Sequence, residues 1–138
     1  DCIPIETWHA LKATVATAIN VAQVAGTRPH ILFCPFHIRL EYSEVYSDDQ
    51  WESMLQLDSP IHLQCYKDNP GDECIIEVVG PQYARRMWWY RQPISVEAND
   101  VWLQGFTMSG GQNGALTVLE GNMGVKLIDM EFNGNSSP

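Results

Sequence analysis

The sequence predicts a mainly β fold: a short right-handed parallel β-helix, which is a type of solenoid, with an N-terminal amphipathic capping helix. Three observations predict it. The chain opens with a helical pattern, continues after residue 26 in short β-type runs separated by turn residues, and contains an internal repeat in its C-terminal part. A chain of 138 residues is long enough for one domain with a buried core. We therefore expect a single domain over residues 1–138.

Residues 4–25 are expected to form the capping helix. Pro4 suits the first turn of a helix, Glu6 suits its positive end, and Gly26 suits its stop. Apolar residues recur at helical spacing along this segment: Ile5, Trp8, Leu11, Val15, Ala18, Ile19 and Ala22. Such a stripe has to be buried, and we expect it to cover the first coil of the β-helix.

Residues 30–134 are expected to form the coils. Gly, Asn, Asp and Pro punctuate this part of the chain, which is typical of short strands joined by turns. The β-type runs are 31–34, 61–65, 74–79, 101–106, 116–118 and 125–132. The segment 41–59 is acidic, aromatic and irregular, and we expect it to be an excursion from the regular scaffold.

The internal repeat carries most of the fold prediction. Apolar and glycine positions recur at an offset of 24, so that Val101, Leu103, Phe106, Met108 and Gly110 match Val125, Leu127, Met130, Phe132 and Gly134. Upstream, Ile94 and Val96 match Leu116 and Val118 at an offset of 22. A period of this length predicts a solenoid in which equivalent residues stack coil on coil. Leucine-rich repeats are disfavoured because their regular pattern is missing. A β-sandwich ranks second because it would not require a constant offset.

Four cysteines, Cys2, Cys34, Cys65 and Cys74, allow three pairings and indicate an oxidising compartment. Cys65 and Cys74 flank residues 69–72, Asn-Pro-Gly-Asp, which is strong turn chemistry. We therefore expect Cys65 to pair with Cys74, and Cys2 with Cys34. A zinc site is the rival interpretation, and the absence of any CxxC pair disfavours it.

The net charge and the targeting features restrict the locations and partners that we expect. Seventeen acidic residues against eight basic ones give a formal net charge of −9, which disfavours binding to nucleic acid or to anionic lipid. No stretch approaches the about 20 apolar residues needed to insert into a membrane. Asn135 begins an N-glycosylation acceptor. With the cysteines, these features predict a secreted or cell-surface glycoprotein, and Asp1 suits the residue that follows a removed signal peptide.

Segments 99–108, 115–118 and 125–132 resemble the right-handed β-helix family, the pectate-lyase-like superfamily. The opening resembles secreted, particularly algal, β-helix-repeat proteins, in which an amphipathic helix precedes a strand like Ile31-Leu-Phe-Cys-Pro35. The resemblance covers residues 5–35 and 60–134. It implies the fold but does not imply one activity, because this superfamily holds lyases, hydrolases, esterases, binding modules and structural proteins.

Catalytic residues of that family do not gather in this sequence. A lyase would need a base beside calcium-binding carboxylates, and the candidates, Arg85, Arg86, Asp48, Asp49 and Glu52, lie in irregular segments. A hydrolase would need aspartates at equivalent places on adjacent coils, and Asp100 and Asp129 are not equivalent. We therefore expect no catalytic residue, no metal and no cofactor, and an enzyme is disfavoured.

The four histidines show no metal-binding spacing. We expect His9, His30, His37 and His62 to be scattered imidazoles on or near the surface, and His37 to approach His62 if strands 31–38 and 61–65 stack.

The segment around residues 83–91 is the least ordinary stretch for so acidic a chain. It combines consecutive aromatic residues with arginines, and its candidate contact residues are Arg85, Arg86, Trp88, Trp89, Tyr90 and Arg91. Aromatic faces stack on sugar rings, and arginines bind carboxylates or sulfates, so a glycan contact is one interpretation. A protein interface is another, and a third is that the rings cover the β-helix or its cap.

The two ends of the predicted β-helix differ. The helix caps one end, whereas nothing comparable closes the other, so either the natural chain continues or this end docks on another subunit. Head-to-tail docking would give a filament. The leading expectation is therefore a non-catalytic extracellular structural or adhesive module, with self-association or other extracellular proteins as partners. The alternative is a polysaccharide-binding or polysaccharide-cleaving protein, similar to a lyase or hydrolase.

Overall fold

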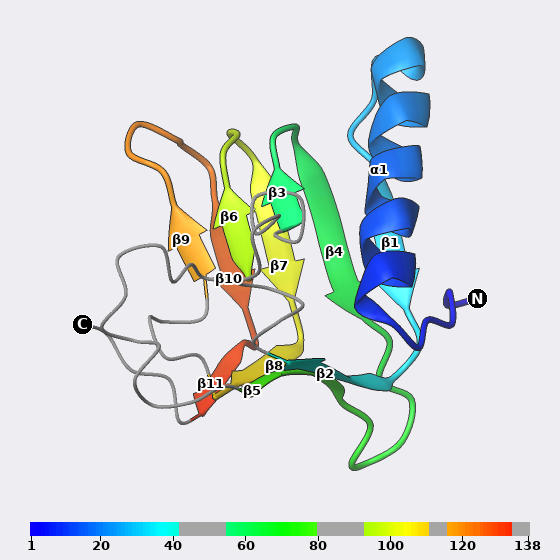
Figure 1. Ribbon diagram of the computed structural model, residues 1–138. Helices are drawn as coiled ribbons and strands as arrows, with labels where there is room; N and C mark the ends of the chain where they lie inside the picture. The colour runs from blue at the N-terminus through cyan, green and yellow to red at the C-terminus, as the bar shows by residue number, and fades with distance from the viewer. Residues whose placement is uncertain (42–54, 80–92, 111–115, 134–138) are drawn as a thin grey trace.

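The computed structural model describes residues 1–41, 55–79, 93–110 and 116–133 (Figure 1). The fold is mainly β, with one N-terminal helix, α1 (Trp8–Ala25), and parallel sheets. The strands are β1 (His30–Phe33), β2 (Phe36–Glu41), β3 (Leu55–Leu57), β4 (Ile61–Cys65), β5 (Cys74–Val79), β6 (Ile94–Val96), β7 (Val101–Gln104), β8 (Phe106–Ser109), β9 (Leu116–Val118), β10 (Lys126–Ile128) and β11 (Glu131–Asn133).

Consecutive strands enter different sheets. The first sheet has the order β1-β4-β7-β10, the second β2-β5-β8-β11 and the third β3-β6-β9, and every pair of neighbours is parallel. The register confirms the repeat expected from the sequence. Leu103 pairs with Leu127 and Met108 with Phe132 at the offset of 24, and β6 pairs with β9 at the offset of 22.

The helix begins four residues later than predicted. Thr7 is its N-cap, with an extended backbone and a side-chain oxygen that accepts a hydrogen bond from the Ala10 N–H. The preceding residues do not join the helix because Ile3 forms a parallel bridge with Phe33, so this segment follows β1 instead. The predicted stop is confirmed: Gly26 has a left-handed backbone and its N–H donates to the Ala22 carbonyl oxygen.

One apolar core joins the helix to the sheets. The buried helical residues are Trp8, Leu11, Val15, Ile19 and Ala22, which confirms the stripe, and α1 lies beside β1 at one end of the sheets (Figure 1). At the bend between the first two sheets, the ring of Phe33 meets those of Phe36 and Phe106 at centroid distances of 6.1 Å. In β3, β4 and β7 alternate residues are buried, as the period of a half-buried strand requires.

Two strand predictions need correction. The runs 101–106 and 125–132 are each broken into two strands, because Gly105 and Asp129 have positive φ angles of 82° and 50° and turn the chain into the next sheet. In addition, β3 lies inside the segment 41–59 that was expected to be irregular, with Leu55 and Leu57 buried. The rest of that excursion, residues 42–54, lies outside the described residues.

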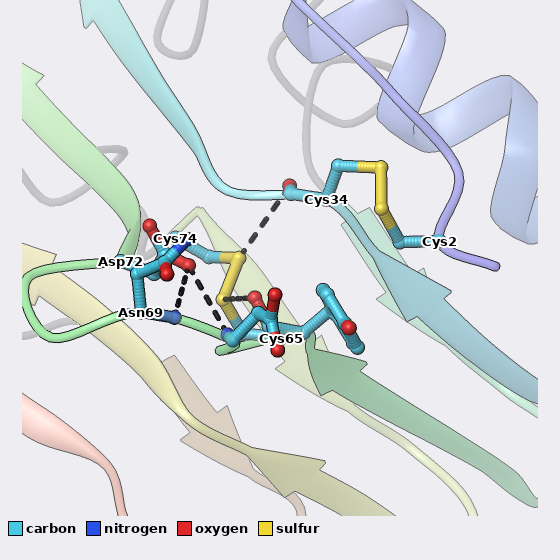
Figure 2. The surroundings of a disulfide bond; sticks show 8 residues. Cys2, Cys34, Cys65, Asn69, Asp72 and Cys74 are labelled. Carbon is cyan, nitrogen blue, oxygen red and sulfur yellow. Dashed lines mark hydrogen bonds between the residues drawn. A yellow bond between two sulfur atoms is a disulfide. The ribbon is translucent and has the colours of Figure 1, made fainter.

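Both disulfides hold the bend between the first and second sheets (Figure 2). Cys2 pairs with Cys34 and Cys65 with Cys74, as expected from the turn between the latter two. The Cys74 sulfur lies 3.7 Å from the Cys34 carbonyl oxygen, so the two bridges are neighbours. Asp72 closes the intervening loop by accepting hydrogen bonds from the N–H groups of Asp68 and Asn69.

Candidate functional site

The outward face of the first sheet gathers polar and aromatic side chains. Because side chains alternate along a strand, burying Ile31, Leu63 and Leu103 turns their neighbours outward. The register then aligns two outward rows: His30, His62, Trp102 and Lys126 in one, and Leu32, Gln64, Gln104 and Ile128 in the other. We use the name His–Trp strip for the set His30, His62, Gln64, Trp102, Gln104 and Lys126, together with Arg28.

Each of the two imidazoles of the strip makes a ring contact and a hydrogen bond with a glutamine on the next strand. The His30 and His62 rings stack, with centroids 4.1 Å apart, and the His62 ring meets Trp102 edge to face at 5.3 Å. Nε2 of His30 lies 2.8 Å from Oε1 of Gln64, and Nε2 of His62 lies 2.9 Å from Oε1 of Gln104. With the amide oxygens as acceptors, each Nε2 carries the proton and donates it.

Two cations lie against the ring of Trp102. The Arg28 guanidinium carbon is 3.9 Å from the ring centroid, and Nζ of Lys126 is 4.3 Å from it. The indole N–H donates to the Gly124 carbonyl oxygen at 3.2 Å, which fixes the ring. Within the described ranges, neither cation has a carboxylate partner, since the ion pair found there joins His37 and Glu77.

The environment of His62 disfavours its charged form. Desolvation by burial lowers the pKa of this imidazole from its ordinary value of 6.5. The hydrogen bond with Gln104 opposes this shift, while the nearby charges of His30 and Arg28 add to it. At neutral pH the strip therefore presents two fixed cations beside a neutral His62.

The expected approach of His37 to His62 is wrong. His37 lies on β2 in the second sheet, where it is in register with Ile75 and its Nε2 is 2.9 Å from Oε1 of Glu77. The neighbour of His62 is His30, because β1 and β4 pair in the first sheet whereas residues 36–41 turn into the second.

On the last strand of each sheet, residues that pair in register with buried residues are themselves exposed. Leu127 is 44% exposed, whereas Leu103, its register partner on β7, is 1% exposed. The same contrast separates Phe132, at 44%, from Met108, at 1%. Val118 on β9 is likewise exposed.

The contact residues expected from the sequence all lie outside the described residues, as do several other candidates. These are Arg85, Arg86, Trp88, Trp89, Tyr90, Arg91 and the glycosylation acceptor Asn135, as well as the acidic candidates Asp48, Asp49 and Glu52. Asp100 and Asp129 occupy turns with positive φ angles. Across residues 1–41, 55–79, 93–110 and 116–133, no three His, Cys, Asp or Glu side chains gather as a metal site would require.

The sequence did not reveal the His–Trp strip as a site. Its members on β1, β4 and β7 pair at offsets of 32 and 40 residues, so the constant offset of 24 that marked β7 and β10 does not reach them. The usable signal was the pair Ile31 and Leu63: aligning these two inward residues also aligns His30 with His62.

Comparison of the chain with protein-family models, with curated protein sequences and with solved structures finds no match. The resemblance to pectate-lyase-like proteins thus stays a prediction. Among the described helices, none is long and apolar enough to cross a membrane.

Proposed function

We propose that this chain is a non-catalytic extracellular adhesive module, built as a short right-handed parallel β-helix, that binds anionic glycans through the His–Trp strip. The passage of consecutive strands through three parallel sheets supports the β-helix, and parallel crossovers are almost always right-handed. Two disulfides support an oxidising, extracellular location, where glycosylation at Asn135 would occur.

The observation that carries the proposal is the pair of cations, Arg28 and Lys126, held against Trp102 without a carboxylate partner in the described part of the chain. A chain with a net charge of −9 has many carboxylates that would neutralise such a pair if only stability were at stake. A bound carboxylate or sulfate would supply the missing charge.

The remaining groups of the strip suit the same ligand. The side-chain amides of Gln64 and Gln104 give their oxygens to the imidazoles, which leaves their N–H groups as donors. The row of His30, His62, Trp102 and Lys126 runs across four strands, about 14 Å at the usual strand spacing, so it suits an extended chain rather than a single small ion. An acidic polysaccharide combines repeated anionic groups with that extended shape.

The test is glycan binding by the intact 1–138 chain, using polygalacturonate as the carboxylated polymer, dextran sulfate as the sulfated one and dextran as the neutral control. We expect at least one anionic polymer to bind, and the double variant Arg28→Gln/Lys126→Gln to weaken its binding about tenfold or more, which is 1.4 kcal/mol or more. Lys67→Gln is the control for each single variant, Arg28→Gln or Lys126→Gln, because it removes one positive charge from the loop after β4, outside the strip.

Several results would overturn the proposal. Equal binding of dextran and the charged polymers would remove the anionic requirement, and unchanged binding by the double variant would remove the strip. Binding of a single-stranded oligonucleotide with the same affinity would point to charge alone rather than to a glycan. Near-ultraviolet circular dichroism of each variant checks that the fold is intact.

A further inference from the structure

We infer that the His–Trp strip is a pH-sensitive binding site: the stacked imidazoles of His30 and His62 take up a proton when an anionic glycan binds, so the strip holds this ligand more tightly in acid than at neutral pH. The inference rests on the proposed function, because it concerns the regulation of the same site. It starts from the position of the two rings, which lie on neighbouring strands in the row that also holds Trp102 and Lys126. Histidine is the side chain whose charge ordinarily changes between about pH 5 and pH 8.

The hydrogen bonds of the two rings determine where an added proton goes. Nε2 of His30 donates to Oε1 of Gln64, and Nε2 of His62 donates to Oε1 of Gln104. In the neutral ring that this requires, Nδ1 carries no proton, so Nδ1 is the atom that acid protonates. Both hydrogen bonds to the glutamines then stay in place, and a charged donor makes them stronger. Acid therefore changes the charge of the strip while the amide N–H groups keep their orientation.

The charged groups around the stack have the same sign as the added proton. His62 contacts His30 on β1 and Trp102 on β7, and the Arg28 charge acts on it from the segment before β1. Arg28 and Lys126 both lie against the ring of Trp102. An imidazolium in the empty strip is therefore surrounded by positive charge.

The neighbouring turns and the helix do not balance this charge. Asp58 and Asp100 precede β4 and β7, but in the described part of the chain neither forms an ion pair with an imidazole. Residues 13–25 of α1, which lies beside β1, carry no charged side chain (Figure 1). Desolvation by burial lowers the pKa of His62, and the charges of His30 and Arg28 lower it further. The empty strip thus resists protonation at neutral pH.

A bound polyanion removes this resistance. A carboxylate or sulfate held by Arg28 and Lys126 brings negative charge to the row of His30 and His62, which stabilises an imidazolium there. The occupied strip then binds more protons than the empty one. Because coupling between two ligands is reciprocal, the anion must bind more tightly as the pH falls.

The experiment is isothermal titration calorimetry of the 1–138 chain with dextran sulfate at pH 7.5, 6.5 and 5.5, in buffers of different ionisation enthalpy. Polygalacturonate replaces dextran sulfate if only the carboxylated polymer binds, and both polymers stay anionic over this range. We expect binding at least about fivefold tighter at pH 5.5 than at pH 7.5, with protons taken up on binding.

Two double variants assign the effect to the stack. His30→Gln/His62→Gln should lose both the pH dependence and the proton uptake. His9→Gln/His37→Gln is the matched control, because it removes two imidazoles from α1 and β2, outside the strip, and should keep the wild-type pH dependence. Near-ultraviolet circular dichroism checks the fold of each variant.

The inference and the proposed function fail in different ways. Absence of binding to both polymers at every pH would refute glycan binding and the inference with it. Equal affinity at pH 7.5 and pH 5.5 would overturn the inference alone, and so would an equal pH dependence in the wild type and His30→Gln/His62→Gln, which would assign the effect to the net charge of the chain. Proton uptake by the wild type needs no variant, and binding without uptake at pH 6.5 would also overturn the inference.

Discussion

The imidazole rings of His30 and His62 lie parallel, 5° apart in orientation and 4.1 Å apart between centroids, on neighbouring strands of the first sheet. A stack of this kind is compatible with two neutral rings or with one charged ring, whereas two charged rings would repel each other. The Arg28 guanidinium adds positive charge on the same side of the sheet. Protonation of His62 at low pH should therefore weaken this stack.

The first prediction concerns the pH dependence of stability. Because the pKa of His62 is lower in the folded chain than its ordinary value of 6.5, the unfolded chain binds more protons below that pH. The contribution of His62 to the free energy of unfolding is thus complete above pH 6.5 and is lost as the pH falls through the folded-state pKa. Urea unfolding at several pH values between 5 and 7.5 should show a smaller loss for His62→Gln than for the wild type. An identical pH profile for the two proteins would contradict this account of the shift.

The second prediction concerns the disulfide between Cys65 and Cys74. Nine positions separate these residues, and closing so short a loop stabilises the folded chain by about 2.5–3 kcal/mol in the chain-entropy model. Because both cysteines are buried, Cys65→Ala/Cys74→Ala should lose at least that much free energy of unfolding in a guanidinium titration. A loss below about 1 kcal/mol would mean that the turn around Asp72 holds the bend without the bridge.

The third prediction compares two glycines with positive φ angles, Gly110 at 77° and Gly121 at 90°. A side chain at either position has to adopt the left-handed region, at a cost of about 1–2 kcal/mol. At Gly110 a Cβ atom would also clash with the Val78 carbonyl oxygen of the neighbouring strand, whereas at Gly121 it would meet open space. Gly110→Ala should therefore lower the thermal midpoint more than Gly121→Ala does, and equal effects would contradict the close approach of β5.

The fourth prediction compares two phenylalanines that both point to the interior. Phe33 is fully buried against Phe36 and Phe106, so Phe33→Ala should lower the free energy of unfolding by about 3–5 kcal/mol. Phe132, on β11, is 44% exposed, and Phe132→Ala should cost less than about 1 kcal/mol. Chemical unfolding measures both. A cost above about 2 kcal/mol for Phe132→Ala would mean that this ring is buried in the folded protein.

The sequence predicted those parts of the fold in which local signals and the repeat agree. The offset of 24 placed Leu127 over Leu103 because no long insertion separates β7 from β10, and turn chemistry identified the pairing of Cys65 with Cys74. The sequence did not predict β3, because a strand of three residues within an acidic, aromatic segment leaves no periodic pattern. The helix start was misplaced because Pro4 suits a helix, while the bridge from Ile3 to Phe33 is a tertiary contact that local propensity does not contain.

The candidate site was harder to predict for the same reason. Arg28, His62 and Trp102 are far apart in the sequence, at unequal separations, and come together because β1, β4 and β7 pair in the first sheet. The residue-type signal favoured Trp88 and its neighbours instead, which lie outside the described residues. Aligning the inward residues of β1 and β4, Ile31 with Leu63, also aligns His30 with His62 and would have located the strip.

The parallel pairing of distant strands also has a kinetic consequence. The hydrogen-bonded side-chain pairs that join adjacent strands, such as His30 with Gln64, His37 with Glu77 and His62 with Gln104, are 34 to 42 residues apart in the chain. Contacts between residues so distant in sequence form only after a large loop has closed, so folding should be slow for a chain of this length. Until β4, β5 and β6 pair with β1, β2 and β3, these three earlier strands have no strand partner and remain open to pairing with other chains. Early closure of the Cys65–Cys74 loop would shorten that vulnerable period.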